Sequence, residues 1–245
     1  MSGAALAWQQ FRIERKLFWR NPSAAFFSFI LPLTLLLLVA SVFADDPSEL
    51  DVLIPGVAGM SVMATTFNAM AYNLTFLREQ GILKRMRGTP MPTGSYFAGF
   101  LGNSVANAFV QVGLVIVVGH FLYDVAWPKD WFELAVFTVV GVITFGSLGI
   151  ALSHAIPNFD SASAYVNALF LPAIMISGVF YSSDSLPAGL AAVAEALPLK
   201  HVIDGFSDAI VTGQGMSHEL GALAVLALWG VAGVMLAIRG FRWER

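Results

Sequence analysis

The sequence predicts an all-α membrane protein with six transmembrane helices, an interfacial helix before the first span and short re-entrant helices on the outer side before the last. Of its 245 residues, 57% are apolar and only 12% are charged, whereas soluble domains are about 25% charged. The charges gather in short stretches and leave six uncharged runs that are long enough for spanning helices. These runs are continuously apolar rather than alternating, which favours helices over barrel strands.

The uncharged runs divide a single domain, residues 1–245, into spans and connecting loops. In the outer helical loop 182–217, two short amphipathic patterns predict helices too short to span, the first ended by Pro198 and the second by Gly213. The spans are predicted at residues 23–44, 52–77, 96–122, 133–153, 161–181 and 220–238.

The basic residues predict the orientation of these spans. With the N-terminus inside, all of the 13 Lys and Arg residues except Lys129 and Lys200 fall in inner segments. Because Lys and Arg are retained on the cytoplasmic side, we expect a multi-pass protein of the cell membrane with both termini in the cytoplasm. A cleaved signal peptide is the competing interpretation of the N-terminus. It is disfavoured because the first apolar run is too long for one and begins only after about 20 residues.

Residues 4–20 have the pattern of an interfacial helix. Arg12, Lys16 and Arg20 recur every four residues and form a basic stripe beside apolar faces. Such a helix can lie in the headgroup layer with its cations toward anionic lipid. The alternative is that these cations are only the positive flank of the first span.

Two polar lines run through the second and third spans, and one further amide lies in the fifth. They allow two interpretations. The side chains can hold helices together through hydrogen bonds worth about 0.6 kcal/mol each, or they can form a surface along which a substrate moves. No acidic or basic residue lies in the middle of a span, so an ion-coupled pump has no obvious coupling group. The possible translocation surface comprises Thr65, Asn68, Tyr72, Asn103, Asn107, Gln111 and Asn167.

Several kinds of chemistry find no support in the sequence. There are no cysteines for disulfides or thiolate metal sites, and no Gly-Lys dipeptide of the kind a phosphate-binding P-loop requires. The four histidines do not pair at metal-ligand spacing. We therefore expect no metal, no cofactor in this chain, no nucleic-acid partner and no enzymatic activity of its own. Energy for uphill transport would have to come from a partner.

The loop at residues 78–95 is the most basic connection between two apolar runs. Placing its cations at the bilayer centre would cost about 10 kcal/mol in total, so the loop must lie outside the hydrocarbon, and its positive sign predicts the cytoplasmic side. Its charged residues are Arg78, Lys84, Arg85 and Arg87, with a single acid, Glu79.

A short helical piece is expected inside this loop, bracketed by Gly81 and the run Gly88-Thr89-Pro90. Within it, Leu83 and Met86 can face a partner. The basic side chains can meet an acidic protein surface or anionic lipid. The alternative is that the same charges only fix the topology of the neighbouring spans.

Two stretches carry a resemblance to a known family. The run FLREQGILKRMRGTPMPTGSYFAG, residues 76–99, resembles the signature of the type-2 ABC exporter permeases, with Ile82 standing where the family more often has Thr. The run LPLKHVIDGFSDAI, residues 197–210, is similar to an outer element before the family's last span. The basic loop most resembles drug-resistance permeases of the daunorubicin-exporter kind. The residues that match the signature are Arg78, Glu79, Gly81, Lys84, Arg85, Thr89 and Pro90.

The resemblance implies a permease subunit that dimerises with itself or a sister permease and binds two P-loop ATPase subunits, which hold Mg-ATP. The cargo would be a hydrophobic or amphipathic drug, natural product or lipid. The rival hypotheses are an energy-independent carrier, channel or assembly scaffold, and a subunit that exports haem or another cofactor. The ATPase-coupling residues implied by the resemblance are Arg78, Glu79, Gly81, Leu83, Lys84, Arg85, Met86, Arg87, Gly88, Thr89 and Pro90.

Overall fold

A computed structural model of the chain describes residues 2–42, 47–88, 92–181 and 186–240. Within these ranges, every regular element is a helix. Six helical segments are long and apolar enough to cross a membrane, which confirms the predicted fold class. They are α2 (Pro22–Val42); the continuous run of α3 (Pro47–Met63), η1 (Ala64–Asn68) and α4 (Ala69–Glu79); α6 (Thr93–Tyr123); α7 (Trp131–Ala155); α8 (Phe159–Ile176); and α11 (Leu220–Gly240).

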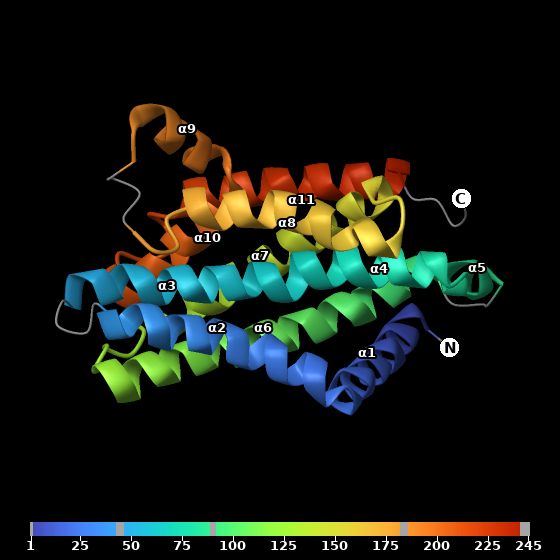
Figure 1. Ribbon diagram of the computed structural model, residues 1–245, viewed down its shortest axis with the longest axis horizontal. Helices are drawn as coiled ribbons and strands as arrows, with labels where there is room; N and C mark the ends of the chain where they lie inside the picture. Colours follow the sequence, from blue (N-terminus) through green and yellow to red (C-terminus); the bar gives the residue numbers. More distant parts are fainter. Residues whose placement is uncertain (1, 43–46, 89–91, 182–185, 241–245) are drawn as a thin grey trace.

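The long helices lie side by side, and the shorter elements cap the two ends of the bundle (Figure 1). α1 (Gly3–Arg20) and α5 (Ile82–Arg87) lie at one end, together with the last turn of α11. α9 (Ala188–Ala196) and α10 (Pro198–Ser207) lie toward the other. We call these the α5 end and the α9 end. The positive-inside rule predicts that the α5 end faces the cytoplasm.

The continuous run from α3 to α4 and helix α7 are the most enclosed spans, whereas α2, α8 and α11 expose most of their side chains. Aromatic side chains fill the centre: Phe137 and Phe145 of α7 and Phe206 of α10 are fully buried. The exposed side chains of the outer helices are largely apolar. This arrangement suits a bundle whose outer surface meets lipid and whose polar backbone is satisfied within helices.

Helix α10 is part of the core rather than a surface element. It packs against α3, α7 and α11, and its Leu199 and Val202 are fully buried. The sequence predicted that Pro198 ends the first outer helix, and α9 does end at Ala196, with Pro198 in the first turn of α10. Gly213, predicted to end the second helix, follows η3 (Asp208–Thr212) with φ +69°. Of the two outer helices expected before the last span, α9 remains largely exposed.

The predicted N-terminal helix is present and is attached to the bundle. α1 packs against the first half of α6, where Gly99 lets the two backbones come close. A Cβ added at Gly99 would lie 2.7 Å from the carbonyl oxygen of Ala7 and 2.8 Å from the backbone nitrogen of Phe11. The Ser95 hydroxyl also donates a hydrogen bond to the Gly3 carbonyl at 3.0 Å. The position of α1 in the headgroup layer stays a prediction.

Candidate functional site

Among the described residues of the basic loop, α5 follows α4 through a turn at Gly81, and we call this turn together with α5 the hairpin. Gly81 joins α4 to α5 with φ +66°, a left-handed conformation that glycine adopts without strain. α5 then runs over the segment in which the sequence predicts a helical piece. Of the predicted coupling residues, Met86 and Arg87 are described in their backbone only. Thr89 and Pro90 lie outside the described residues.

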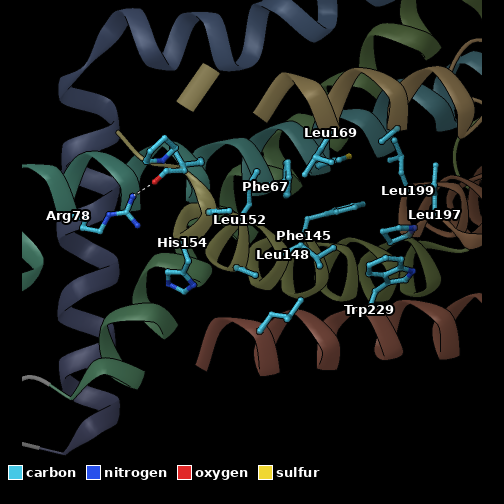
Figure 2. Close-up of a pocket in the computed structure, with 18 residues that line it drawn as sticks. Phe67, Arg78, Phe145, Leu148, Leu152, His154, Leu169, Leu197, Leu199 and Trp229 are labelled. Atoms are coloured by element: carbon cyan, nitrogen blue, oxygen red, sulfur yellow. Dashed lines mark hydrogen bonds between the residues drawn. The ribbon is translucent and has the colours of Figure 1, made fainter. Parts of the chain in front are cut away.

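The first two predicted coupling residues bind the turn between α7 and α8. The Arg78 guanidinium donates a hydrogen bond to the carbonyl oxygen of Ser153 at 2.8 Å. It donates a second to the carbonyl oxygen of Ile156 at 2.6 Å, also at the C-terminal end of α7 (Figure 2). The Glu79 carboxylate accepts a hydrogen bond from the Phe159 backbone N–H at 2.6 Å, at the start of α8. We call this set of contacts the Arg78–Glu79 clamp. It ties the end of α4 to the next turn at the same end of the bundle.

The clamp uses complementary charges at helix ends. Carbonyl groups at a helix C-terminus carry partial negative charge and N–H groups at an N-terminus carry partial positive charge, so the cation and the anion each meet a favourable partner. The rings of Phe76 and Phe159, 5.4 Å apart at their centroids, pack edge to face beside it. These contacts join the α4–α5 corner directly to the α7–α8 turn.

Leu83 differs from its predicted role. Its side chain is only 3% exposed and packs in a small apolar cluster of this same chain rather than facing a partner. The physical reason is that a six-residue helix has one apolar side, and α5 turns that side to the bundle. Lys84 and Arg85 are exposed on α5 and face outward. The cluster that holds Leu83 comprises Met70, Leu74, Tyr96, Phe100 and Ile150.

A polar cavity of about 430 Å³ lies beneath α1. It is enclosed by α1, α2, the η1–α4 segment and α6, and it contains most of the polar side chains that the sequence placed on two helix faces. η1 is a π-helical turn, a local widening that is frequent at functional sites. The predicted residues that line this polar cavity are Thr65, Asn68, Tyr72, Asn103 and Asn107.

Some of these side chains join helices. The Arg15 guanidinium of α1 donates a hydrogen bond to Asn107 Oδ1 of α6 at 2.6 Å. The Thr65 hydroxyl donates to Gln111 Oε1 at 2.9 Å, and the Gln111 amide nitrogen donates to the Ser28 carbonyl oxygen of α2. The interpretation as interhelical hydrogen bonding therefore fits Asn107 and Gln111.

Two other side chains of the polar cavity have an oxygen atom that makes no hydrogen bond between helices. Asn68 Oδ1 and Asn103 Oδ1 are buried and have no hydrogen-bond partner among the described residues. Asn167 belongs to neither group. It is exposed on α8, outside the polar cavity, and donates to Ser163 Oγ at 3.2 Å. A translocation role for these residues stays a prediction.

A larger, apolar cavity of about 920 Å³ runs along the bundle between α7, α8 and α11 (Figure 2). Arg78 and His154 lie at one end of it, and Leu197, Leu199 and Trp229 at the other. Phe67 of η1 lines this apolar cavity, so η1 contributes to both cavities. Sequence reasoning did not predict it, because apolar side chains from several helices give no pattern that distinguishes a cavity wall from a packed core.

Comparison with known proteins identifies the family of this chain. Residues 4–211 match the family model described as ABC-2 type transporter. The chain is similar to the linearmycin resistance permease protein LnrN of Bacillus subtilis (strain 168), with 21% identity over 189 residues that cover 76% of this chain and 48% of that protein. It is also similar to the inner membrane transport permease YadH of Escherichia coli (strain K12), with 24% identity over 159 residues, 65% of this chain and 62% of that protein.

A third relative is nodulation protein J of Rhizobium meliloti (strain 1021), 25% identical over 188 residues, which are 75% of this chain and 71% of that protein. The matched part of the chain spans about half of the linearmycin resistance permease and under two thirds of YadH. The family model, in contrast, matches most of the chain. Together with the six spanning helices, this match shows that the chain is a multi-pass membrane protein of the ABC-2 type transporter family.

Proposed function

We propose that this chain is the membrane-spanning permease of an ATP-driven exporter. Two copies of a separate P-loop ATPase drive the exporter, and α5 is the docking element for the ATPase. The permease dimerises with itself or a sister permease. The observation that supports the proposal is the Arg78–Glu79 clamp. It binds the end of α4, next to the predicted docking element α5, to the turn between α7 and α8, and both of these helices line the apolar cavity.

The proposed mechanism follows from these contacts. ATP-driven closure of the ATPase pair pushes on the exposed Lys84 and Arg85 side of α5, and Leu83 passes the movement to the bundle because it is packed there. Through the clamp, the α7–α8 turn moves together with α5. The apolar cavity then changes shape between inward-open and outward-open states.

The two cavities support an amphipathic cargo such as a drug, natural product or lipid. One is apolar and the other is lined by amides, a carboxyl and hydroxyl groups, and η1 lies between them. The names of two relatives mention different processes, linearmycin resistance and nodulation. The proposal is therefore made for a class of cargo.

Co-purification from native cells tests the docking of the ATPase. Arg85→Glu reverses one exposed charge on α5, and Arg239→Glu reverses one exposed charge in the last turn of α11, at the same end of the bundle. We expect wild type and Arg239→Glu to retain a P-loop ATPase and Arg85→Glu to retain at least about tenfold less, which corresponds to about 1.4 kcal/mol.

Three outcomes would contradict this proposal. The first is a wild-type chain that brings down no ATPase. The second is equal recovery with Arg85→Glu. The third is transport by vesicles that contain the purified chain alone without nucleotide, which would favour the energy-independent carrier.

A further inference from the structure

We infer that the polar cavity binds the protonated amine of an amphipathic ligand, with Glu14 of α1 as its counter-charge. This rests on the proposed function in one respect: it names the chemical class of cargo for a cavity assigned to the permease. Binding itself requires neither the ATPase nor nucleotide, so the two can fail separately.

The polar cavity offers hydrogen-bond acceptors that the protein leaves unused. Asn103 is only 7% exposed, and its Oδ1 has no hydrogen-bond partner among the described residues. Asn68 of η1 also lines the cavity, and its Oδ1 is likewise buried and without a partner in the described ranges. A buried acceptor without a donor costs about 1–3 kcal/mol. A ligand that donates hydrogen bonds to both oxygens would relieve this cost.

The same cavity contains one carboxyl group. Glu14 lines it, and in the described parts of the chain this side chain accepts a single hydrogen bond, from the Gln10 amide at 2.7 Å. Burial raises the pKa of Glu14, and the hydrogen bond from Gln10 opposes that rise. An ammonium group is the ligand that would compensate both a poorly solvated carboxylate and the two amide oxygens.

Aromatic side chains strengthen the assignment of a cation. Phe18, Tyr72 and Phe100 also line the cavity, and the faces of aromatic rings attract ammonium groups by about 0.5–2 kcal/mol. The nearby cation, Arg15, is already bound to Asn107 and lies 5.8 Å from the Trp19 ring centroid. The amine is therefore assigned to Glu14, Asn68 and Asn103 and not to the Asn107 side.

The volume of the cavity limits what it can hold. About 430 Å³ lies near the lower end of the range for small-molecule pockets. It can accept an amine head group with a few neighbouring atoms. Because α1 is expected in the headgroup layer, a ligand partitioned into the inner leaflet would present its amine at this depth while its apolar part stays in lipid or protein.

A binding measurement with two matched probes tests the inference. The probes are N-dansyl-1,12-diaminododecane, which keeps one free amine, and its N-acetylated analogue, which has lost that charge. The full chain is placed in nanodiscs of phosphatidylcholine at pH 7, and fluorescence in empty nanodiscs is subtracted. We expect wild type to bind the free amine at least tenfold more tightly than the acetylated probe.

Two variants separate the cavity from general attraction to acidic groups. Glu14→Gln keeps the size and hydrogen-bonding ability of the side chain but removes its charge, and we expect it to lose the tenfold preference. Asp160→Asn removes an exposed acid near the same end of the bundle, in the first turn of α8, and should keep the preference.

The other outcomes would overturn the inference. Equal affinity of wild type for the two probes, or an unchanged preference in Glu14→Gln, would show that the cavity does not select an amine. Binding of both probes that depends on Asn103→Ala but not on Glu14→Gln would assign uncharged donors instead. Absence of binding above the signal of empty nanodiscs would show that the polar cavity does not bind the amine probe. If the preference is found but no ATPase co-purifies, only the proposed function fails.

Discussion

At the scale of single residues, Asp208 shows how one buried acid organises the α9 end of the bundle. Its carboxylate, only 3% exposed, accepts hydrogen bonds from the Thr212 hydroxyl, the Gln214 N–H at 3.0 Å and the Gly215 N–H at 2.9 Å. Burial alone raises the pKa of Asp208, but these hydrogen bonds outweigh it, and the pKa lies below its ordinary value. The acid therefore fixes the turn that leads from η3 to α11.

This pKa predicts a pH dependence of stability. A carboxyl whose pKa is lower in the folded state contributes stability above its unfolded value of about 3.9, and that contribution is lost as the pH falls through the folded value. We expect Asp208→Asn to lower the free energy of unfolding at pH 7 by about 1–3 kcal/mol. Thermal unfolding of the detergent-solubilised protein, followed by tryptophan fluorescence, measures this.

The difference between wild type and Asp208→Asn should shrink as the pH falls below about 4 and the wild-type carboxyl gains its proton. A difference that stays constant or grows on acidification would contradict the assignment.

The clamp residues show what sequence reasoning can and cannot reach at this scale. The charge pattern identified Arg78 and Glu79 as special, but their partners Ser153, Ile156 and Phe159 follow more than 70 residues later. Nothing local predicts these contacts. The orientation of Leu83 could not be predicted for a related reason. A six-residue helix with both apolar and basic side chains can turn its apolar side to a partner or to the bundle, and only the apolar cluster next to α5 decides between them.

At the scale of elements, the attachment of α1 to α6 decides whether the polar cavity exists, because α1 forms one of its walls. The close approach at Gly99 has no room for a side chain. The sequence predicted α1 as a helix from its basic stripe and placed a polar line on the third span, which is α6. It did not predict that the two would meet, since helix periodicity defines faces and not their partners.

We therefore expect Gly99→Ala to loosen α1, because backbone atoms of Ala7 and Phe11 would have to move by several tenths of an ångström. Limited proteolysis within α1 should become at least threefold faster. Gly113→Ala is the matched control, since Gly113 lies on the same helix with nothing within 4 Å of an added Cβ. Equal proteolysis of the two variants would show that the contact does not hold α1.

Helix α10 illustrates the opposite case, in which an element was predicted but its environment was not. The amphipathic pattern predicted a second outer helix between Pro198 and Gly213, and α10 followed by η3 occupies this segment. Its burial among α3, α7 and α11 follows from side chains such as Leu199 and Phe206, which fill the α9 end of the core.

At the scale of the whole molecule, the bundle combines two cavities of different polarity with a hairpin at one end. The sequence predicted the polar side chains of one cavity, because Thr65, Asn68 and Tyr72 recur at helical spacing and so share a face. The apolar cavity could not be predicted, since Phe67, Phe145 and Leu199 have the composition of an ordinary core. The clamp connects the hairpin to the helices that line that cavity.

The central claim is that α5 is the cytoplasmic docking element for the ATPase, and cross-linking from a single cysteine tests it most directly. The chain has no cysteine of its own, so Arg85→Cys and the control Gln214→Cys each introduce one unique thiol, at the α5 end and in the exposed turn before α11. A bifunctional maleimide reagent is added to inside-out membrane vesicles, and cross-linked partners are identified by mass spectrometry. We expect a P-loop ATPase attached to Arg85→Cys and none attached to Gln214→Cys. Modification of Arg85→Cys by an impermeant maleimide in intact cells, or the absence of an ATPase among its cross-linked partners, would contradict it.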